Sequence, residues 1–321
     1  MGLSIESIKF LVAAHISGVC FGETLTLGRQ HVIASPRQIV AVLKGGGAWP
    51  PPEGESTFIE SLAQAEWRFE VLARCLGAQK VVACDISDYE GAGIIHDMNQ
   101  PIKVEDEERF DTVIDGGTLE HVFNFPIAIA NAMRLTKVGG NLILFAPANN
   151  NFGHGFYQFS PELFYRVLSP ENGFKVRKMV AIVDDIAECG NLFGIRYPFL
   201  VNGPGYEVVD PVDVGARVTL MNDLPVGLMV LAERVSREEI FKTVPQQSDY
   251  VPQWQASLDH SAKEAVARSF SDRVIAWVRQ HFPETLWREI LPKIAVVVDP
   301  FRSARYRKER SFSNGKFFKK S

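Results

Sequence analysis

Short apolar runs alternate with helical patterns through the first half of the chain. Runs of apolar and β-branched residues closed by turn residues predict buried strands, and they lie at 24–28, 80–85, 94–97, 110–115 and 141–146. Apolar positions at helical spacing lie before and between these runs, at 4–17, 36–44, 57–76 and 126–137. Because strands and helices alternate, we expect an α/β fold whose parallel sheet carries helices on both faces.

Two more strands are predicted further along the chain, at 174–183 and 226–232. A helix that starts at Ser160-Pro161 precedes them. No convincing helix connects the two strands, so they are expected to pair like a hairpin at the edge of the sheet. The segment 184–225 between them is rich in Gly, Pro and Asp, which indicates an inserted loop region. The sequence thus predicts seven strands in a mostly parallel sheet.

Residues 236–321 differ from the rest of the chain. Helical patterns predominate there, so the chain divides into a domain at 1–235, with inserts at about 31–56 and 184–225, and a C-terminal helical extension. Beyond Pro300 the sequence has many lysines and arginines but a single acid, Glu309, and aromatic residues lie among them. This basic tail is either a disordered solubilising end or a weak contact with an acidic surface.

Composition narrows the class of protein. Hydrophobic residues make up 46% and charged residues 22%, which is the balance of a soluble globular protein with a real core, and a net charge of −4 does not indicate nucleic-acid binding by the whole molecule. The four cysteines show no CxxC pairing and are expected to be reduced thiols of a cytoplasmic protein; they are Cys20, Cys75, Cys84 and Cys189.

Three acids end successive predicted strands. Asp85 follows the second strand, where a carboxylate commonly accepts hydrogen bonds from ribose hydroxyls. Asp97 follows the third strand, where it can accept a hydrogen bond from an adenine amino group, and Asp115 ends the fourth, before Gly116-Gly117. The carboxyl ends of parallel strands meet at one edge, so the acids should line one rim. The open alternative is that each is a turn or helix-capping residue.

The segment 149–164 after the fifth strand is unusually aromatic. A loop of this composition should pack over a pocket, because exposing it would forgo apolar burial. His154 is a candidate general base for an acceptor hydroxyl or amine, and Tyr157 is the second candidate catalytic residue. The alternative is that His154 only hydrogen-bonds the loop backbone. The sequence predicts no metal site, since His121 and His154 are far apart along the chain.

Four motifs in this order resemble the class I S-adenosylmethionine-dependent methyltransferases over residues 20–235. They are VVACDIS, HDMN, FDTVIDGGTLEHV and LTKVGGNLILFAP. The resemblance implies a Rossmann-like fold and S-adenosylmethionine as cofactor. It implies that Asp85 binds the ribose, that Asp97 lies by the adenine, and that Asp115, Gly116 and Gly117 line the methionine side.

The first glycine motif of that family is degenerate here. Its counterpart is LTLGRQHV at 25–32, which keeps only Gly28 and places Gln30 and Val32 where glycines are expected. Arg29 is expected to offset the loss by pairing with the cofactor carboxylate.

Three functions follow as hypotheses. The first is methyl transfer to a small-molecule or glycan-type acceptor bound under the loop 149–160. The second is a non-catalytic binding protein on the same scaffold that has lost the cofactor, which the missing glycines favour. The third is a nicotinamide oxidoreductase, which the absence of a G-x-G-x-x-G motif disfavours.

Overall fold

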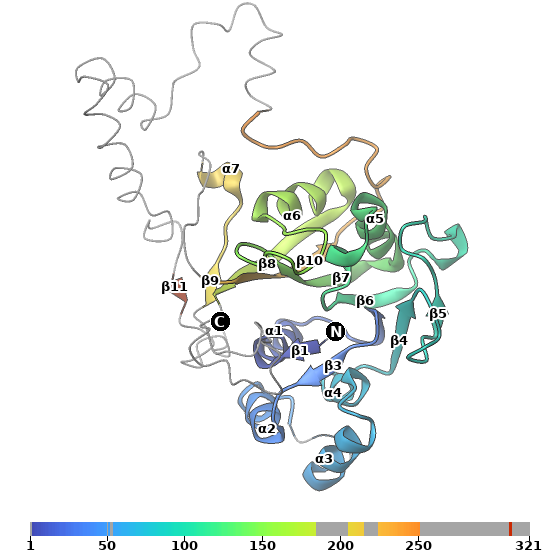
Figure 1. Ribbon diagram of the computed structural model, residues 1–321, viewed down its shortest axis with the longest axis vertical. Coiled ribbons are helices and arrows are strands. Elements are labelled where there is room, and N and C mark those ends of the chain that lie inside the picture. Colours follow the sequence, from blue (N-terminus) through green and yellow to red (C-terminus); the bar gives the residue numbers. More distant parts are fainter. Residues whose placement is uncertain are drawn as a thin grey trace, which may run out of the picture.

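The computed structural model describes residues 2–49, 51, 54–183, 205–214 and 224–250, and the backbone of 308–309 (Figure 1). The helices predicted within 236–321 and the basic tail, apart from the backbone of 308–309, lie outside these residues, as does Cys189. No helix within the described ranges is both long enough and apolar enough to cross a bilayer.

A nine-stranded sheet forms the centre of the described structure, in the order β11-β9-β8-β10-β7-β6-β2-β4-β5. Five strands pair in parallel: β2 (Glu23–Leu27), β4 (Lys80–Asp85), β5 (Ile94–Ile95), β6 (Phe110–Asp115) and β7 (Thr136–Pro147). Next to β7, β10 (Val226–Arg234) is antiparallel to both of its neighbours, β7 and β8 (Phe174–Val183). The predicted pairing of the last two strands, across the insert, is therefore confirmed.

The seven predicted strands all form, but the predicted number is too low. Two short strands, β9 (Gly205–Glu207) and β11 (Lys308–Glu309), continue the sheet beyond β8. A separate pair, β1 (Gly2–Ser4) and β3 (His31–Ile33), forms a parallel two-stranded sheet. Runs of two or three residues are too short to show a period of two, so the sequence pattern cannot predict them.

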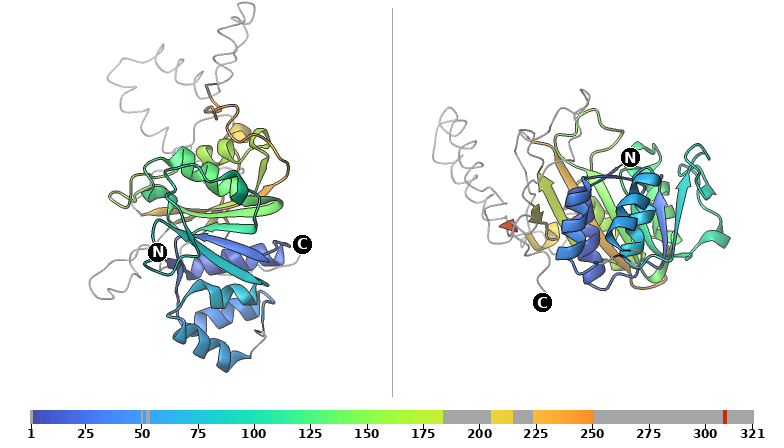
Figure 2. Two further views of the ribbon diagram at one scale, coloured as in Figure 1. Left: turned by 90° about the vertical axis from the view of Figure 1, so that its right-hand side faces the viewer. Right: turned by 90° about the horizontal axis from the view of Figure 1, so that it is seen from below.

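Helices cover both faces of the sheet, as predicted (Figure 2). One face carries α1 (Ile5–Ile16), α2 (Pro36–Gly45), α3 (Glu55–Gln64) and α4 (Phe69–Cys75), whereas the other carries α5 (Phe125–Leu135) and α6 (Pro161–Val167). Alternate strand residues feed two separate cores: Val113 packs with the α5 face and Ile114 with the α1 face. This alternation is the reason the central strands are apolar throughout.

Two helix predictions need correction. The pattern over 57–76 is not one helix opened by a Thr57 capping box, because α3 begins at Glu55 after Gly54 and no side chain caps it. Glu66 and Trp67 have positive φ angles of 53° and 60°, which end α3 and turn the chain into α4. Such angles are uncommon for residues other than glycine, so the apolar stripe alone could not predict the break.

The helix predicted over 126–137 also ends early, at Leu135. Thr136 is the first residue of β7, and the predicted turn at Gly139-Gly140 lies inside that strand. The guanidinium of Arg234 donates to the carbonyl of Met133 at 3.4 Å and to that of Thr136 at 2.6 Å. A distant residue therefore helps to terminate the helix, which a local pattern cannot reveal.

The order of the parallel strands reverses direction between β2 and β6. From β2 the chain moves outward on one side to β4 and then β5, whereas β6 and then β7 lie on the other side. In open α/β sheets, ligands bind in the crevice beyond the carboxyl ends of the strands at such a switch point. The carboxyl edge around β2 and β6 is therefore the place where a ligand site is expected.

Candidate active site at the carboxyl edge of the sheet

The three predicted acids lie at the carboxyl edge of the sheet. Asp85 ends β4, Asp115 ends β6, and Asp97 follows β5 by two residues. The strand register places Leu27, the last residue of β2, level with both Cys84 and Asp115. Because these strands run in parallel, the structure brings the acids to one rim, as the sequence predicts.

Gly28 and Arg29 follow directly after β2. Gly28 has a φ of +66°, and its N–H donates to the carbonyl of Cys84 at 2.7 Å. A left-handed residue of this kind lets the chain turn sharply at the end of the strand. Arg29 donates to the carbonyl of Gly91 at 2.7 Å and lies 3.5 Å from the carboxylate of Glu70 on α4. The Arg29 guanidinium thus bridges two elements of the fold rather than facing open solvent.

Gln30 occupies the switch point itself. Its side chain is buried, and Nε2 donates to the carbonyl of Leu27 at 2.7 Å. A β-carbon placed on Gly116 would lie only 2.2 Å from Gln30 Oε1, so residue 116 must be a glycine for this contact to exist. Gln30 Oε1 is buried and has no hydrogen-bond partner among the described residues. The switch point therefore contains a buried acceptor that has no donor among the described residues.

Asp115 is fully buried at the end of β6. Its Oδ1 accepts a hydrogen bond from the backbone N–H of Thr118 at 2.8 Å, which holds the turn through Gly116 and Gly117. Burial, and then the negative charge of Glu120, raise the pKa of the Asp115 carboxyl. A ligand at this strand end would therefore meet the backbone of Gly116 and Gly117 rather than the Asp115 side chain.

Asp97 organises the loop that follows β5. Its Oδ1 accepts hydrogen bonds from the backbone N–H and the side-chain amide of Asn99, both at 2.9 Å, and these bonds lower the pKa of Asp97. Asn99 in turn accepts from the backbone N–H of Asn124, just before α5. Asp85 is less constrained: its Oδ1 accepts from the N–H of Ile86 at 2.7 Å. Of the predicted acids, Asp97 has the clearest turn-forming role.

The aromatic loop 149–160 packs down in part: Phe159 is buried, as the sequence predicts, whereas Phe152 and Phe156 are 100% and 66% exposed. The backbone N–H of Phe156 donates to the carbonyl of Glu120 at 2.8 Å, and the hydroxyl of Tyr157 donates to the carbonyl of Phe123 at 2.5 Å. The ring of Phe159 lies 4.7 Å from that of Phe125 on α5, centroid to centroid. These contacts fix the loop against the short 3-10 helix η2 (Leu119–His121) and the start of α5.

The folded loop creates a cluster that sequence spacing does not reveal. His154 Nε2 lies 3.5 Å from Glu120 Oε1, and His121 Nε2 lies 3.8 Å from the same oxygen. The hydrogen bond with Glu120 raises the pKa of His154, against the lowering effect of partial burial. Glu120 and His121 are neighbours in η2, whereas His154 reaches them only because the loop folds back over that helix.

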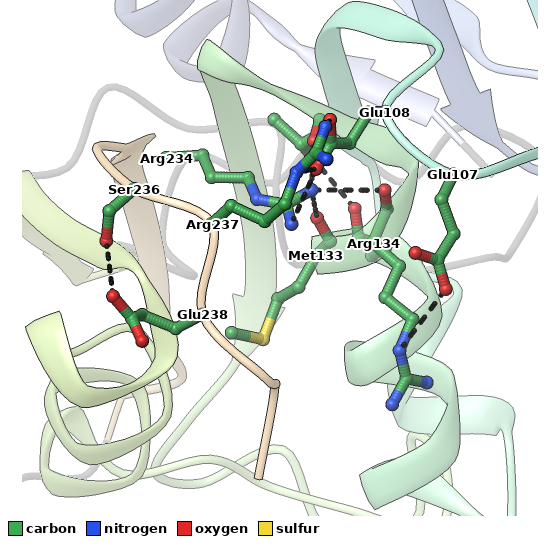
Figure 3. Close-up of polar contacts among 10 residues, drawn as sticks. Glu107, Glu108, Met133, Arg134, Arg234, Ser236, Arg237 and Glu238 are labelled. Carbon is green, nitrogen blue, oxygen red and sulfur yellow. Dashed lines mark hydrogen bonds and ion pairs between the residues drawn. The ribbon is translucent and has the colours of Figure 1, made fainter. Parts of the chain in front are cut away.

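A hollow of about 380 Å³ opens at the opposite edge of the sheet. Figure 3 shows Arg234 and Arg237 converging there on the carboxylate of Glu108. Arg234 is 3% exposed and donates to carbonyls at the end of α5, while Glu107 pairs with Arg134 at 3.8 Å. Its charged groups are largely paired with one another, so this hollow is a junction between elements rather than the expected ligand site.

Comparison with known proteins returns solved structures alone, since no family model and no curated protein matches the chain. An S-adenosylmethionine-dependent methyltransferase from Thermotoga maritima is 17% identical, with 72% of this chain and 91% of that chain covered and a TM-score of 0.31. The 1,6-didemethyltoxoflavin-N1-methyltransferase of Burkholderia thailandensis, with bound S-adenosylhomocysteine, is 15% identical over 71% of this chain and 77% of that chain, with a TM-score of 0.31.

A third similar structure is the branched-chain polyamine synthase of Thermus thermophilus in complex with 5'-methylthioadenosine. It is 13% identical over 77% of this chain and 62% of that chain, with a TM-score of 0.34. The strand order and the two helical layers of this chain define a Rossmann-like α/β protein.

Proposed function

We propose that the protein is an S-adenosylmethionine-dependent methyltransferase that acts on a small-molecule acceptor. The observation that carries the proposal is the reversal of strand order between β2 and β6, with Gly28 and Asp85 at the edge where the strands end. The core of the sheet has seven strands and is mostly parallel, as the sequence resemblance implies. Its antiparallel strand, β10, lies between β7 and β8. The cofactor is proposed to lie across this edge.

The residues at the edge suit the proposed cofactor. The Asp85 carboxylate, at the end of β4, is proposed to accept hydrogen bonds from the ribose hydroxyls. Gln30 Oε1, buried at the switch point without a donor among the described residues, is proposed to accept a hydrogen bond from the cofactor's ammonium group. Asp97 is assigned to the adenine side and the Gly116-Gly117 backbone to the methionine side, where the buried Asp115 is proposed to hold the turn rather than to touch the cofactor. Arg29 is assigned to the carboxylate, for which it must exchange its contact with Glu70.

The bound cofactor supplies a methyl group already activated on a sulfonium sulfur. The protein then has to align the acceptor with that methyl group and, for a weak nucleophile, take its proton. The loop 149–160 is proposed to cover the acceptor. His154 is the proposed proton acceptor, because the Glu120 carboxylate beside it favours the protonated imidazole. Tyr157 is proposed to position the loop through its bond to the Phe123 carbonyl.

Titration calorimetry with S-adenosylhomocysteine tests the proposed cofactor site. We expect one site per chain, and we expect Asp85→Ala to weaken binding by about tenfold to a hundredfold, since it removes hydrogen bonds to a charged acceptor. Asp106→Ala is the matched control, because Asp106 lies in the turn before β6, at the opposite edge of the sheet. Equal affinity in the native protein and in Asp85→Ala would place the ligand elsewhere.

One observation favours the second function, a binding protein without cofactor. Gln30 stands at a position where the methyltransferase family has a glycine, and its side chain fills the space in front of Gly116. Gln30→Ala separates the two functions. If Gln30 binds the cofactor, the variant binds S-adenosylhomocysteine more weakly than the native protein does. If Gln30 closes the site, the native protein does not bind, and binding appears only in the variant.

A further inference from the structure

Three potential metal ligands from two segments of the chain meet beside the carboxyl edge. One ligand atom each from Glu120, His121 and His154 lie within 4.8 Å of one another. The two distances from Glu120 Oε1 to the imidazole Nε2 atoms are 3.5 Å and 3.8 Å. In a tetrahedral site with metal–ligand bonds of about 2.0–2.1 Å, neighbouring ligand atoms are about 3.3 Å apart. The cluster therefore needs only small side-chain movements to enclose a cation.

The backbone around the cluster is firmly held. The carbonyl of Glu120 accepts the N–H groups of both Phe156 and Tyr157, at 2.8 Å and 3.3 Å. Gly155 lies so close to η2 that a β-carbon there would be 3.0 Å from Glu120 O and 3.3 Å from His121 Nδ1. The loop that carries His154 is thus tied directly to the turn that carries the other two ligands.

A second, independent observation points to a cation. Glu120 is 1% exposed, and its Oε2 is buried with no hydrogen-bond partner in the described part of the chain. Asp115, also fully buried, likewise has an Oδ2 without a partner there, and Glu120 lies near enough to act on its charge. It is costly to keep both neighbouring buried carboxylates ionised with unsatisfied oxygens unless a positive charge compensates them.

We propose that Glu120, His121 and His154 bind a divalent transition-metal ion. Two imidazoles and one carboxylate suit Zn²⁺, Co²⁺, Mn²⁺ or Fe²⁺ better than Mg²⁺ or Ca²⁺, which prefer oxygen ligands throughout. Three protein ligands leave coordination positions open, as in catalytic rather than structural sites. Because His154 belongs to the loop 149–160, an oxygen or nitrogen of a small molecule held by that loop is the expected further ligand.

The cation also changes the role of His154. An imidazole nitrogen bound to a metal has no lone pair left to take a proton, so His154 is the base only in the metal-free protein. In the metal-loaded protein, the ion would lower the pKa of a bound hydroxyl, so that its proton could pass to solvent water instead of to His154. The site does not depend on methyl transfer, since its ligands are present whether or not the cofactor binds.

Metal titration of the 321-residue chain without S-adenosylmethionine tests the site. After treatment with a chelator, the protein is titrated with Zn²⁺ by calorimetry and with Co²⁺ by visible absorption, which reports the ligand geometry. We expect one ion at micromolar affinity or tighter. His121→Ala and His154→Ala should each weaken binding at least tenfold, and His15→Ala, on α1 at the opposite face, should not.

The two histidine variants are suited to the test because both side chains are partly exposed, 49% for His121 and 37% for His154. Circular dichroism and thermal melting of the metal-free variants check that they fold. Native protein that binds neither ion more tightly than millimolar would overturn the proposal. So would a folded His121→Ala or His154→Ala variant with native affinity. Neither outcome bears on the cofactor site, which the S-adenosylhomocysteine titration tests separately.

Discussion

The side chains at the carboxyl edge divide into those that hold the fold and those that remain available. Asp97 and Asp115 are engaged in turns, through Asn99 and Thr118 respectively. The sequence places both correctly at strand ends, because buried strands closed by turn residues are visible in the pattern. It could not show that one oxygen of each carboxylate already holds a turn, since that depends on partners two or three residues on. Nor could it show that the Gln30 side chain packs against Gly116.

The pairing of His154 with Glu120 gives a prediction at the residue scale. Because the hydrogen bond raises the folded-state pKa of His154 above its unfolded value, the pair stabilises the folded state fully below about pH 6.5. This contribution is lost as the pH rises through the raised pKa. NMR titration of the metal-free protein should show a higher pKa for His154 in the native chain than in Glu120→Gln. An equal or lower pKa in the native protein would contradict the pairing.

Among the elements, long strands with uninterrupted apolar runs are predictable and the joints between elements are not. β6 and β8 have the predicted bounds because each is closed by turn residues at both ends. The break between α3 and α4 and the early end of α5 escape prediction, because left-handed residues and a distant arginine make them. The loop 149–160 is predictable in part: its aromatic content predicts that it packs, but not which elements it packs against.

At the scale of the loop, Gly155 should be intolerant of a side chain. A β-carbon at 3.0 Å from the Glu120 carbonyl oxygen and 3.2 Å from its Cγ forces the loop away from η2. We expect Gly155→Ala to lower the free energy of unfolding by about 1–3 kcal/mol, as overpacking does, and to weaken metal binding. Denaturant unfolding measures the first effect and the Co²⁺ titration the second.

Gly153→Ala is the matched control for the loop. Gly153 also has a positive φ, +85°, but a β-carbon there would meet nothing within 4 Å. It therefore carries the conformational strain of a left-handed alanine without the clash. If both variants bind metal like the native protein, the contact between Gly155 and η2 does not position His154.

At the edge of the sheet opposite the proposed site, one buried arginine links β10 to α5 and to the turn before β6. Arg234, at the end of β10, pairs with Glu108 at 3.3 Å and donates to the carbonyls of Met133 and Arg134 near the end of α5. Arg237 pairs with the same carboxylate from an exposed position, 75% accessible at its side chain. Sequence alone cannot separate these two arginines, because both fall near the boundary at residue 235 that the sequence predicts for the domain.

The two arginines should differ sharply in their effect on stability. Arg234→Leu removes the buried charge and leaves carbonyl groups unsatisfied, so we expect it to lower the free energy of unfolding by about 3 kcal/mol. Arg237→Leu should change stability little, since water replaces an exposed partner. Chemical denaturation of the two variants beside the native protein measures the difference. Equal losses would show that Arg234 does not join these elements.

The most direct test of the central claim is to find which edge of the sheet binds the cofactor product. Backbone amide NMR spectra of the assigned native protein are recorded during titration with S-adenosylhomocysteine. We predict saturable shifts at Gly28, Gln30, Asp85 and Gly116, all at the carboxyl edge between β4 and β6. Shifts confined to Glu108, Arg234 and Arg237 at the opposite edge, or no shifts at any concentration, would contradict the assignment.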